Sequence, residues 1–157
     1  MNDYELLLEQ ISKEVPVIEM DLKVETGLDA TYEDNVIYLD KNFSWVEKKI
    51  HLSEEFSHHK TSVGNIIDYN NPESRKQEWK ARRDSIERLV SLDCLIDCAY
   101  ANCRSKYECA EYLNVTEAFL DEVMEYYHAK YGNEYLYRGC IFNFTDESIF
   151  IINTNLN

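Results

Sequence analysis

Apolar residues recur at the spacing of an amphipathic helix in several stretches of the chain. Residues 4–14 carry their leucines and isoleucine on one side, which predicts a short helix that Pro16 ends. Residues 45–60 also follow a helical pattern, and Ser44 with Glu47 three positions later predicts a capping box at the start of that helix. Further helices are predicted over residues 72–89, 92–101, 106–113 and 117–131.

A different pattern, with alternating or β-branched apolar residues, predicts strands in three places. Residues 17–22 and 35–39 each favour a strand, and residues 27–32 between them favour a turn. The aromatic and β-branched segment 135–152 is interrupted by the polar residues 145–148, which predicts a closing β-hairpin.

These elements predict an α+β protein that is mainly helical and has a small antiparallel sheet. We expect a main lobe over residues 1–90, a helical region over residues 91–132, and a C-terminal hairpin over residues 133–157 that packs on the rest. Internal repeats and low-complexity segments are absent from the sequence.

Composition narrows the classes of function. The chain has 157 residues, of which 45% are hydrophobic, so it can bury a substantial core. Its formal net charge of −14 argues against direct contact with nucleic-acid phosphates, which requires clustered cations. A basic partner, or a basic segment of a substrate protein, suits this charge better.

Five cysteines and the lack of a long apolar run indicate a cytoplasmic protein with reduced thiols. We expect no membrane association. Cys94 and Cys98 stand one helical turn apart, where they can form a metal-binding pair, although a free cysteine more often behaves as a small buried hydrophobic residue.

The helix predicted over residues 45–60 carries the candidate chemistry. In a zinc-peptidase helix of the H-E-x-x-H type, two histidines one turn apart bind zinc and the glutamate is the general base. Here Glu54 stands at the first histidine position, Glu55 at the glutamate position and His58 at the second histidine position. Because residues four apart point the same way, Glu54 and His58 can bind one ion.

A third ligand must come from another element. Glu78 is the best candidate, because Ala81 three residues later is small enough to let its helix approach the motif helix. His51 and His59 are alternative ligands, since His51 shares a side of the helix with Glu55 and with one of the two adjacent histidines. A polar cluster of this kind is also typical of a solvated helix face without any metal.

The segments described above resemble the ImmA/IrrE-like metallopeptidases of phages and other mobile elements. The resemblance covers most of the chain from about residue 33 to 132. The order of its parts is more specific than the short motif alone. These parts are the strand 35–40, the motif 54–59, the T-S-x-G loop 61–64, the E-x-x-A segment 78–81 and the helical segment 104–113.

The resemblance implies a zincin-like metallopeptidase core in the lobe 1–90, a zinc ion, and cleavage of a helix-turn-helix repressor encoded beside the protein. Within it, Glu55 matches the general base, and His58 and Glu78 match metal ligands. Glu54 is the departure from the family motif. Two carboxylates and one histidine make a harder, more anionic site, which shifts preference towards manganese or another divalent ion that favours oxygen.

Two functions from different classes remain open. The chain is either a metallo-endopeptidase that cleaves the repressor, or a catalytically weak or inactive relative that acts by binding it. Residues 107–116 resemble the first helix and turn of a helix-turn-helix motif, so the helical region 91–132 is expected to be of that kind. The acidic start of the next helix, from Glu117, would repel phosphate, so we expect a protein partner and not nucleic acid.

Overall fold

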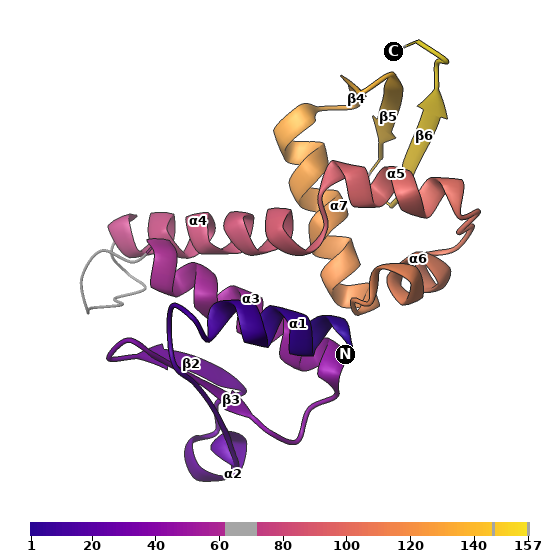
Figure 1. The fold of residues 1–157 in the computed structure, drawn as a ribbon. Coiled ribbons are helices and arrows are strands. Elements are labelled where there is room, and N and C mark those ends of the chain that lie inside the picture. The colour runs from indigo at the N-terminus through magenta and orange to yellow at the C-terminus, as the bar shows by residue number, and fades with distance from the viewer. Residues whose placement is uncertain (62–71, 146, 157) are drawn as a thin grey trace. The chain divides into compact units, whose positions relative to one another are not determined.

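A computed structural model describes residues 1–61, 72–145 and 147–156 of the chain. The fold is α+β, as predicted, and the chain divides into two compact units, Met1–Leu89 and Val90–Asn157. Figure 1 shows the helices and strands of each unit. Among the described residues, no helix is both long enough and apolar enough to cross a membrane.

The first unit contains a three-stranded mixed sheet. Its strands are β1 (Val17–Met20), β2 (Ala30–Glu33) and β3 (Val36–Asp40), and β3 lies in the middle. Strand β1 is parallel to β3, and β2 is antiparallel to it. The predicted antiparallel sheet is therefore wrong for this unit. The chain passes from β1 through helix α2 (Leu22–Thr26) and strand β2, and so enters β3 in the direction of β1.

Strand β2 replaces the second half of the turn predicted over residues 27–32. Gly27, at φ 78°, ends helix α2, and the chain then becomes extended and pairs with β3. The actual reversal lies at Asp34 and Asn35, which have φ values of 50° and 62°. Two adjacent residues with positive φ form the tight turn that suits the twist of a hairpin.

Helices α1 (Asp3–Ile11) and α3 (Trp45–Thr61) lie on one face of this sheet (Figure 1). The capping box predicted at the start of α3 is confirmed, because the Glu47 backbone N–H donates to Ser44 Oγ at 3.2 Å and the Ser44 N–H donates to Glu47 Oε2 at 3.1 Å. The two helices and β3 share one hydrophobic core. Its buried residues are Tyr4, Ile11, Val15, Ile37, Leu39, Leu52 and Phe56.

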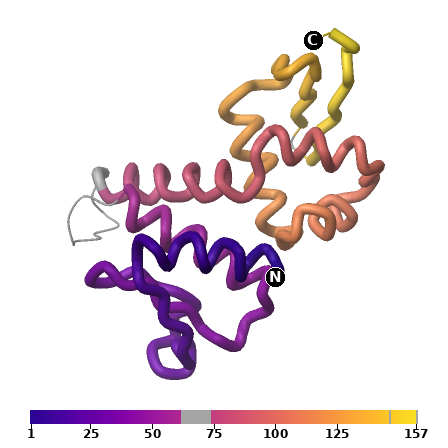
Figure 2. Tube along the Cα trace, viewed as in Figure 1, coloured from indigo at the N-terminus to yellow at the C-terminus, as the bar shows by residue number. Residues whose placement is uncertain are grey.

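Helix α4 (Pro72–Leu89) packs along α3 in the direction opposite to it (Figure 2). The T-S-x-G loop expected between them falls on residues 61–64, of which 62–64 lie outside the described residues. Because α3 and α4 are in extensive contact, side chains from these two helices can converge on one point.

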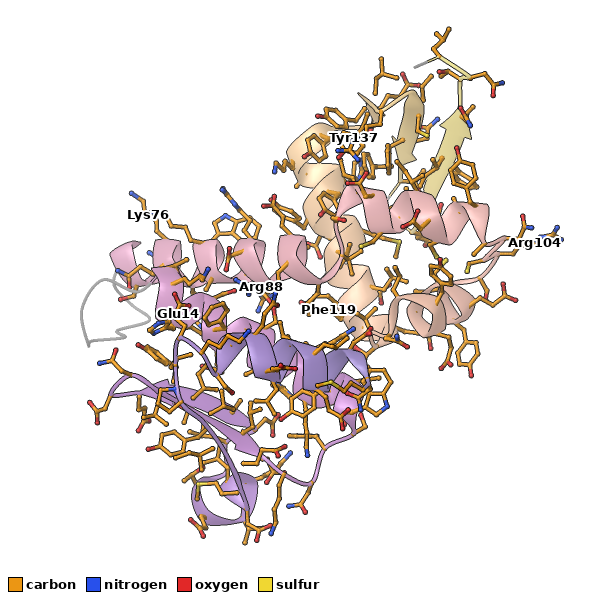
Figure 3. All side chains as sticks on the ribbon, in the orientation of Figure 1. Glu14, Lys76, Arg88, Arg104, Phe119 and Tyr137 are labelled. Carbon is orange, nitrogen blue, oxygen red and sulfur yellow. The ribbon has the colours of Figure 1, made fainter. Side chains whose placement is uncertain are left out.

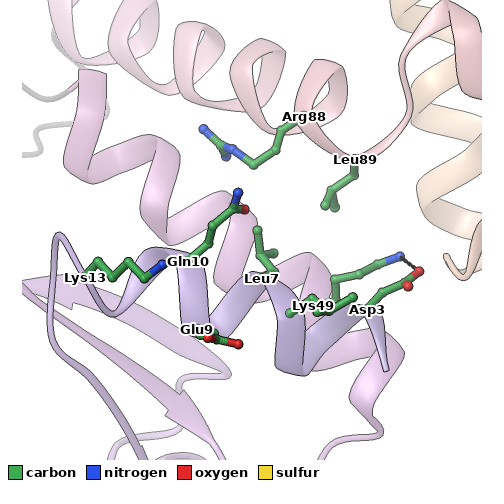
Figure 4. A pocket seen from close by; sticks show the side chains of 9 residues that line it. Asp3, Leu7, Glu9, Gln10, Lys13, Lys49, Arg88 and Leu89 are labelled. Carbon is green, nitrogen blue, oxygen red and sulfur yellow. Dashed lines mark ion pairs between the residues drawn. The ribbon is translucent and has the colours of Figure 1, made fainter. Parts of the chain in front are cut away.

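A cavity of about 480 Å³ lies elsewhere in the first unit, next to α1. Figure 4 shows that Leu7 and Gln10 of α1 face Arg88 and Leu89 of α4 across it. The Asp3 carboxylate pairs with the ammonium of buried Lys49 at one edge, at 3.7 Å. None of the predicted metal ligands lines this cavity, so the candidate metal site lies outside it.

The second unit consists of three helices and an antiparallel sheet. The helices are α5 (Leu92–Tyr100), α6 (Lys106–Leu113) and α7 (Glu117–Tyr131), and the strands are β4 (Glu134–Tyr137), β5 (Cys140–Phe144) and β6 (Ile149–Asn153). The predicted hairpin has two strands, whereas the structure has three strands in this segment. Arg138 and Gly139, at φ 47° and 73°, add a second tight turn, and buried Phe142 lies on the central strand.

Candidate metal centre

Three polar side chains from two helices converge in the first unit. Glu54 and His58 extend from adjacent turns of α3, and Glu78 extends from α4. One ligand atom from each lies within 4.8 Å of the others. His58 Nε2 lies 3.3 Å from Glu78 Oε2, and the His58 side chain is 14% exposed and that of Glu78 is 33% exposed. The structure therefore brings together the three residues that the sequence suggested as ligands.

The packing of α4 on α3 places Glu78 beside the motif. Ala81, one turn further along α4, is completely buried, in keeping with a small residue at a close helix–helix contact. Ser53 and Ser57 precede Glu54 and His58 by one residue each, and both serines are completely buried. Ser85 Oγ donates to Ser53 Oγ at 2.9 Å, so the buried polar side chains of the two helices are joined directly.

Arg88, which is partly exposed, adds a further polar link between the helices. Its guanidinium donates to Ser57 Oγ at 2.8 Å and to the Ser53 carbonyl oxygen at 3.0 Å, and it forms an ion pair with Asp84 one turn earlier on α4. Ser57 Oγ in turn donates to Asp84 Oδ2 at 2.8 Å. Figure 3 shows Arg88 on the side of α4 that faces α3. Charge-assisted hydrogen bonds are stronger than neutral ones, so this partly exposed network helps to hold the two helices together next to the three candidate ligands.

Glu55 lies beside this group in a strongly perturbed environment. Burial raises the pKa of its carboxyl group to about 8, and the nearby carboxylates of Glu54 and Glu78 add to this effect. Three carboxylates are thus gathered around a single histidine. Without a cation, Glu55 retains its proton at neutral pH; a divalent ion would offset the repulsion among these groups.

The pKa of Glu55 leads to a prediction for the metal-free protein. Because the folded-state pKa lies above the ordinary value of 4.5, stability falls as the pH rises from about 4.5 to about 8 and stays reduced above that range. We expect Glu55→Gln to stabilise the metal-free protein at pH 9 by up to a few kcal/mol, at about 1.4 kcal/mol per pKa unit, and to have little effect at pH 4.5. Urea unfolding of both proteins in the presence of a chelator measures this difference. An equal difference at both pH values would contradict the burial of this carboxyl group.

The structure places the two alternative ligands in other environments. His59 Nδ1 is hydrogen-bonded to the Tyr32 hydroxyl at 2.8 Å, and its ring stacks on Phe56. The His51 ring packs against Phe43, with 5.1 Å between the ring centroids. Neither histidine is part of the group formed with Glu54, although His59 is adjacent to His58 in the sequence.

Sequence reasoning missed the contact that holds His59 and the polar pairs that join α3 to α4 beside the site. Tyr32, from the unpredicted strand β2, orients His59 and also donates to Asn35 Oδ1 at 2.8 Å. The serine pair directly before Glu54 and His58, and the Asp84–Arg88 pair on α4, each have four-residue spacing. That shared spacing was a signal that the helices face each other through polar side chains.

The donor set matches the requirements of a divalent ion. Atoms bound at 2.0 to 2.2 Å to one tetrahedral ion lie about 3.3 to 3.6 Å apart, and the His58–Glu78 separation is 3.3 Å. The other members of the group lie within 4.8 Å, a distance that small side-chain rotations can shorten. One imidazole and two carboxylates accept zinc, and the oxygen donors also suit manganese.

Comparison with known proteins identifies a family. A sequence model of a peptidase family, described as the IrrE N-terminal-like domain, matches residues 12–125 of the chain. This match confirms the resemblance to ImmA/IrrE-like metallopeptidases, and it includes all three candidate ligands and Glu55. Comparisons with curated proteins and with solved structures give no significant match.

Proposed function

Because the chain belongs to the family of IrrE N-terminal-like domains, we propose that it is a metal-dependent endopeptidase with its active centre at Glu54, His58 and Glu78. The observation that carries this proposal is the convergence of these three ligand atoms within 4.8 Å, with Glu55 next to them on α3. A divalent ion held there would act as a Lewis acid and lower the pKa of a water molecule. In this proposal the helix would supply two of the metal ligands and an adjacent proton acceptor.

Glu55 is the group that would take up the proton from the attacking water. An acceptor at this position later returns the proton to the nitrogen of the leaving peptide. In the metal-free protein the raised pKa keeps Glu55 protonated at neutral pH. A divalent ion beside it would lower that pKa and leave a carboxylate that can accept a proton near neutral pH. Its own turn of α3 is held by the Ser53 and Ser57 contacts with Arg88, so its backbone position is fixed independently of the substrate.

The substrate we propose is a helix-turn-helix repressor encoded beside this protein in a phage or mobile element. The family resemblance supports this class of substrate. The net charge of −14 supports it too, because a DNA-binding repressor carries a basic surface that an acidic protein attracts. Complementary charge of this kind raises the rate of association and depends on salt concentration.

Incubation of the purified protein with that repressor tests the function. We expect defined repressor fragments when zinc or manganese is present, and an intact repressor when a chelator is present. Mass spectrometry of the fragments identifies the cleaved bond. An intact repressor under every metal condition, combined with loss of the repressor from its operator, would contradict the catalytic function and support binding alone.

That second function, inactivation of the repressor by binding, is favoured by one specific observation. Glu54 adds a negative charge at a position where the motif has a neutral histidine, and more ligand charge makes a bound ion a weaker Lewis acid. A metallopeptidase-like fold with such a centre can retain the docking surface for a repressor while hydrolysing it slowly.

Glu54→His distinguishes slow hydrolysis caused by this ligand from an inactive fold. The substitution restores two histidines one turn apart, so we expect repressor cleavage to rise by about tenfold or more, equivalent to about 1.4 kcal/mol of barrier. Time courses of cleavage at a fixed zinc concentration measure the change. Adding Glu55→Gln to this variant is the control and should remove the gain. Unchanged or lower activity of Glu54→His would show that Glu54 does not limit turnover.

A further inference from the structure

Three cysteines of the second unit converge, although they are separated in the sequence. Cys98 lies on α5, Cys103 lies in the connection that follows, and Cys109 lies on α6. Their sulfur atoms all lie within 4.8 Å of one another. All three are free thiols; Cys98 is buried and the other two are half-buried. The sequence pattern had suggested a different pair, Cys94 with Cys98, but Cys94 instead receives a hydrogen bond from Ser91 Oγ at 3.2 Å.

The end of α5 explains how two of these cysteines meet. Asn102 has φ 60° and reverses the chain, so that the Cys103 N–H donates to the Cys98 carbonyl oxygen at 3.4 Å and the Asn102 N–H donates to that of Ala99 at 3.1 Å. These two bonds form a Schellman motif, which brings Cys103, the second residue after the helix cap Ala101, back against the last turn of α5.

The third cysteine has an independent origin. The Ser105 hydroxyl accepts a hydrogen bond from the Glu108 N–H at 3.1 Å and begins α6, which turns Cys109 back towards the connection. The Cys109 thiol approaches the Cys103 carbonyl oxygen at 3.9 Å. No local capping rule requires a cysteine at this position. Helix termination alone therefore does not explain why the three cysteine thiols converge.

The three cysteines also line one cavity of about 470 Å³ within the second unit. Its other walls include Leu95 of α5, Met124 of α7 and Phe150 of β6. These three walls are apolar, whereas Arg104, Lys106 and Glu147 line the same cavity with charged groups. The three sulfur atoms are the soft ligands that the cavity offers to an ion. The cavity also leaves space for a fourth ligand, such as water, on the side of the cysteines that faces it.

We propose that Cys98, Cys103 and Cys109 form a second metal site, which binds a thiophilic divalent ion of the zinc class. Zinc–sulfur bonds of 2.3 Å require the sulfur atoms to lie about 3.8 to 4.0 Å apart, and the observed limit of 4.8 Å is close enough for side-chain rotation to reach that distance. Thiolate ligands select zinc and related soft ions over magnesium or calcium. Each cysteine that binds the ion releases its thiol proton to water, and no oxidation is involved.

Such an ion would connect α5 to α6 across the sharp turn between them. Because it would bind the folded chain more tightly than the unfolded one, it would also stabilise the second unit as its free concentration rises. This site uses none of the residues of the centre in the first unit, so either site can be present without the other.

Titration of the full-length, reduced, metal-free protein with Cd²⁺ tests the site. Cadmium bound to thiolate gives an ultraviolet charge-transfer band that carboxylate and imidazole ligands do not produce, so the centre on α3 does not interfere. We expect the band to saturate at one equivalent of thiolate-bound cadmium. In Cys103→Ser the affinity reported by the band should fall by more than about a hundredfold, since loss of a direct ligand exceeds the 10- to 100-fold effect of losing an outer partner.

Cys94→Ser is the matched control, because Cys94 is a half-buried thiol one turn from Cys98 on the same helix. It should retain the band and the affinity of the natural protein. Cys109→Ser is the second test variant, and circular dichroism establishes that both test variants are folded. Absence of the band in the natural protein would overturn the site. So would equal affinity in a folded Cys103→Ser or Cys109→Ser variant, or formation of a disulfide among the three cysteines without any cadmium band.

Discussion

Glu55→Gln is expected to lower repressor cleavage by about a hundred- to ten-thousandfold, the range that general acid–base catalysis contributes. Glutamine has the size of glutamate but cannot accept the proton from water. Glu54, His58 and Glu78 remain unchanged, so metal affinity should be retained. Cleavage rates at saturating metal, together with metal titration by calorimetry, separate loss of the proton acceptor from loss of the ion.

The control for this variant is Glu47→Gln, which changes a carboxylate in the first turn of the same helix. In the described part of the chain this carboxylate is hydrogen-bonded to the capping residue Ser44. It should cleave at a rate close to that of the natural protein. Cleavage by Glu55→Gln at an unchanged rate would show that another group accepts the proton. A large loss of metal binding in this variant would instead make Glu55 part of the ligand set.

His58→Ala is expected to lower the affinity for zinc or manganese by more than about a hundredfold and to abolish cleavage. His58 is the only imidazole in the group, and its removal leaves two carboxylates that must hold the ion without a nitrogen ligand. Glu78 also loses the partner that lies 3.3 Å away in the metal-free protein. Calorimetric titration of the metal-free variant measures the affinity directly.

Two histidines on the same helix provide matched controls for His58→Ala. His51 packs against Phe43, and His59 is bonded to Tyr32, so His51→Ala and His59→Ala should each bind metal with nearly natural affinity. An equal loss in His59→Ala would place that residue among the ligands. An unchanged affinity in His58→Ala would rule out a metal centre at the motif.

Local patterns predicted the parts of this structure that depend on local interactions. The helix expected over residues 45–60 is confirmed as α3, because its capping box and its apolar spacing both operate within a few residues. The four-residue spacing of Glu54 and His58 fixed their common direction once the helix was known. The position of Glu78 followed from a pattern as well, since Ala81 marks a close contact between helices.

The missed features depend on how one segment pairs or packs with another, which the pattern within a single segment does not contain. Strand β2 forms because it pairs with β3, and its own residues gave a turn signal. The parallel pairing of β1 with β3 depends on the route of the chain through α2 and β2. The approach of Cys109 to Cys98 required both the turn at Asn102 and the packing of α6, which no spacing rule contains.

Anomalous X-ray diffraction from crystals grown with zinc or manganese tests the metal centre most directly. We expect a strong peak at the α3–α4 contact, bonded at about 2.0 to 2.2 Å to a carboxylate oxygen of Glu54, to His58 Nε2 and to a carboxylate oxygen of Glu78. Glu55 should lie close to the ion without being bonded to it. An empty α3–α4 contact at saturating metal, or an ion bound through His51 or His59 and not through Glu54, would contradict the proposed centre.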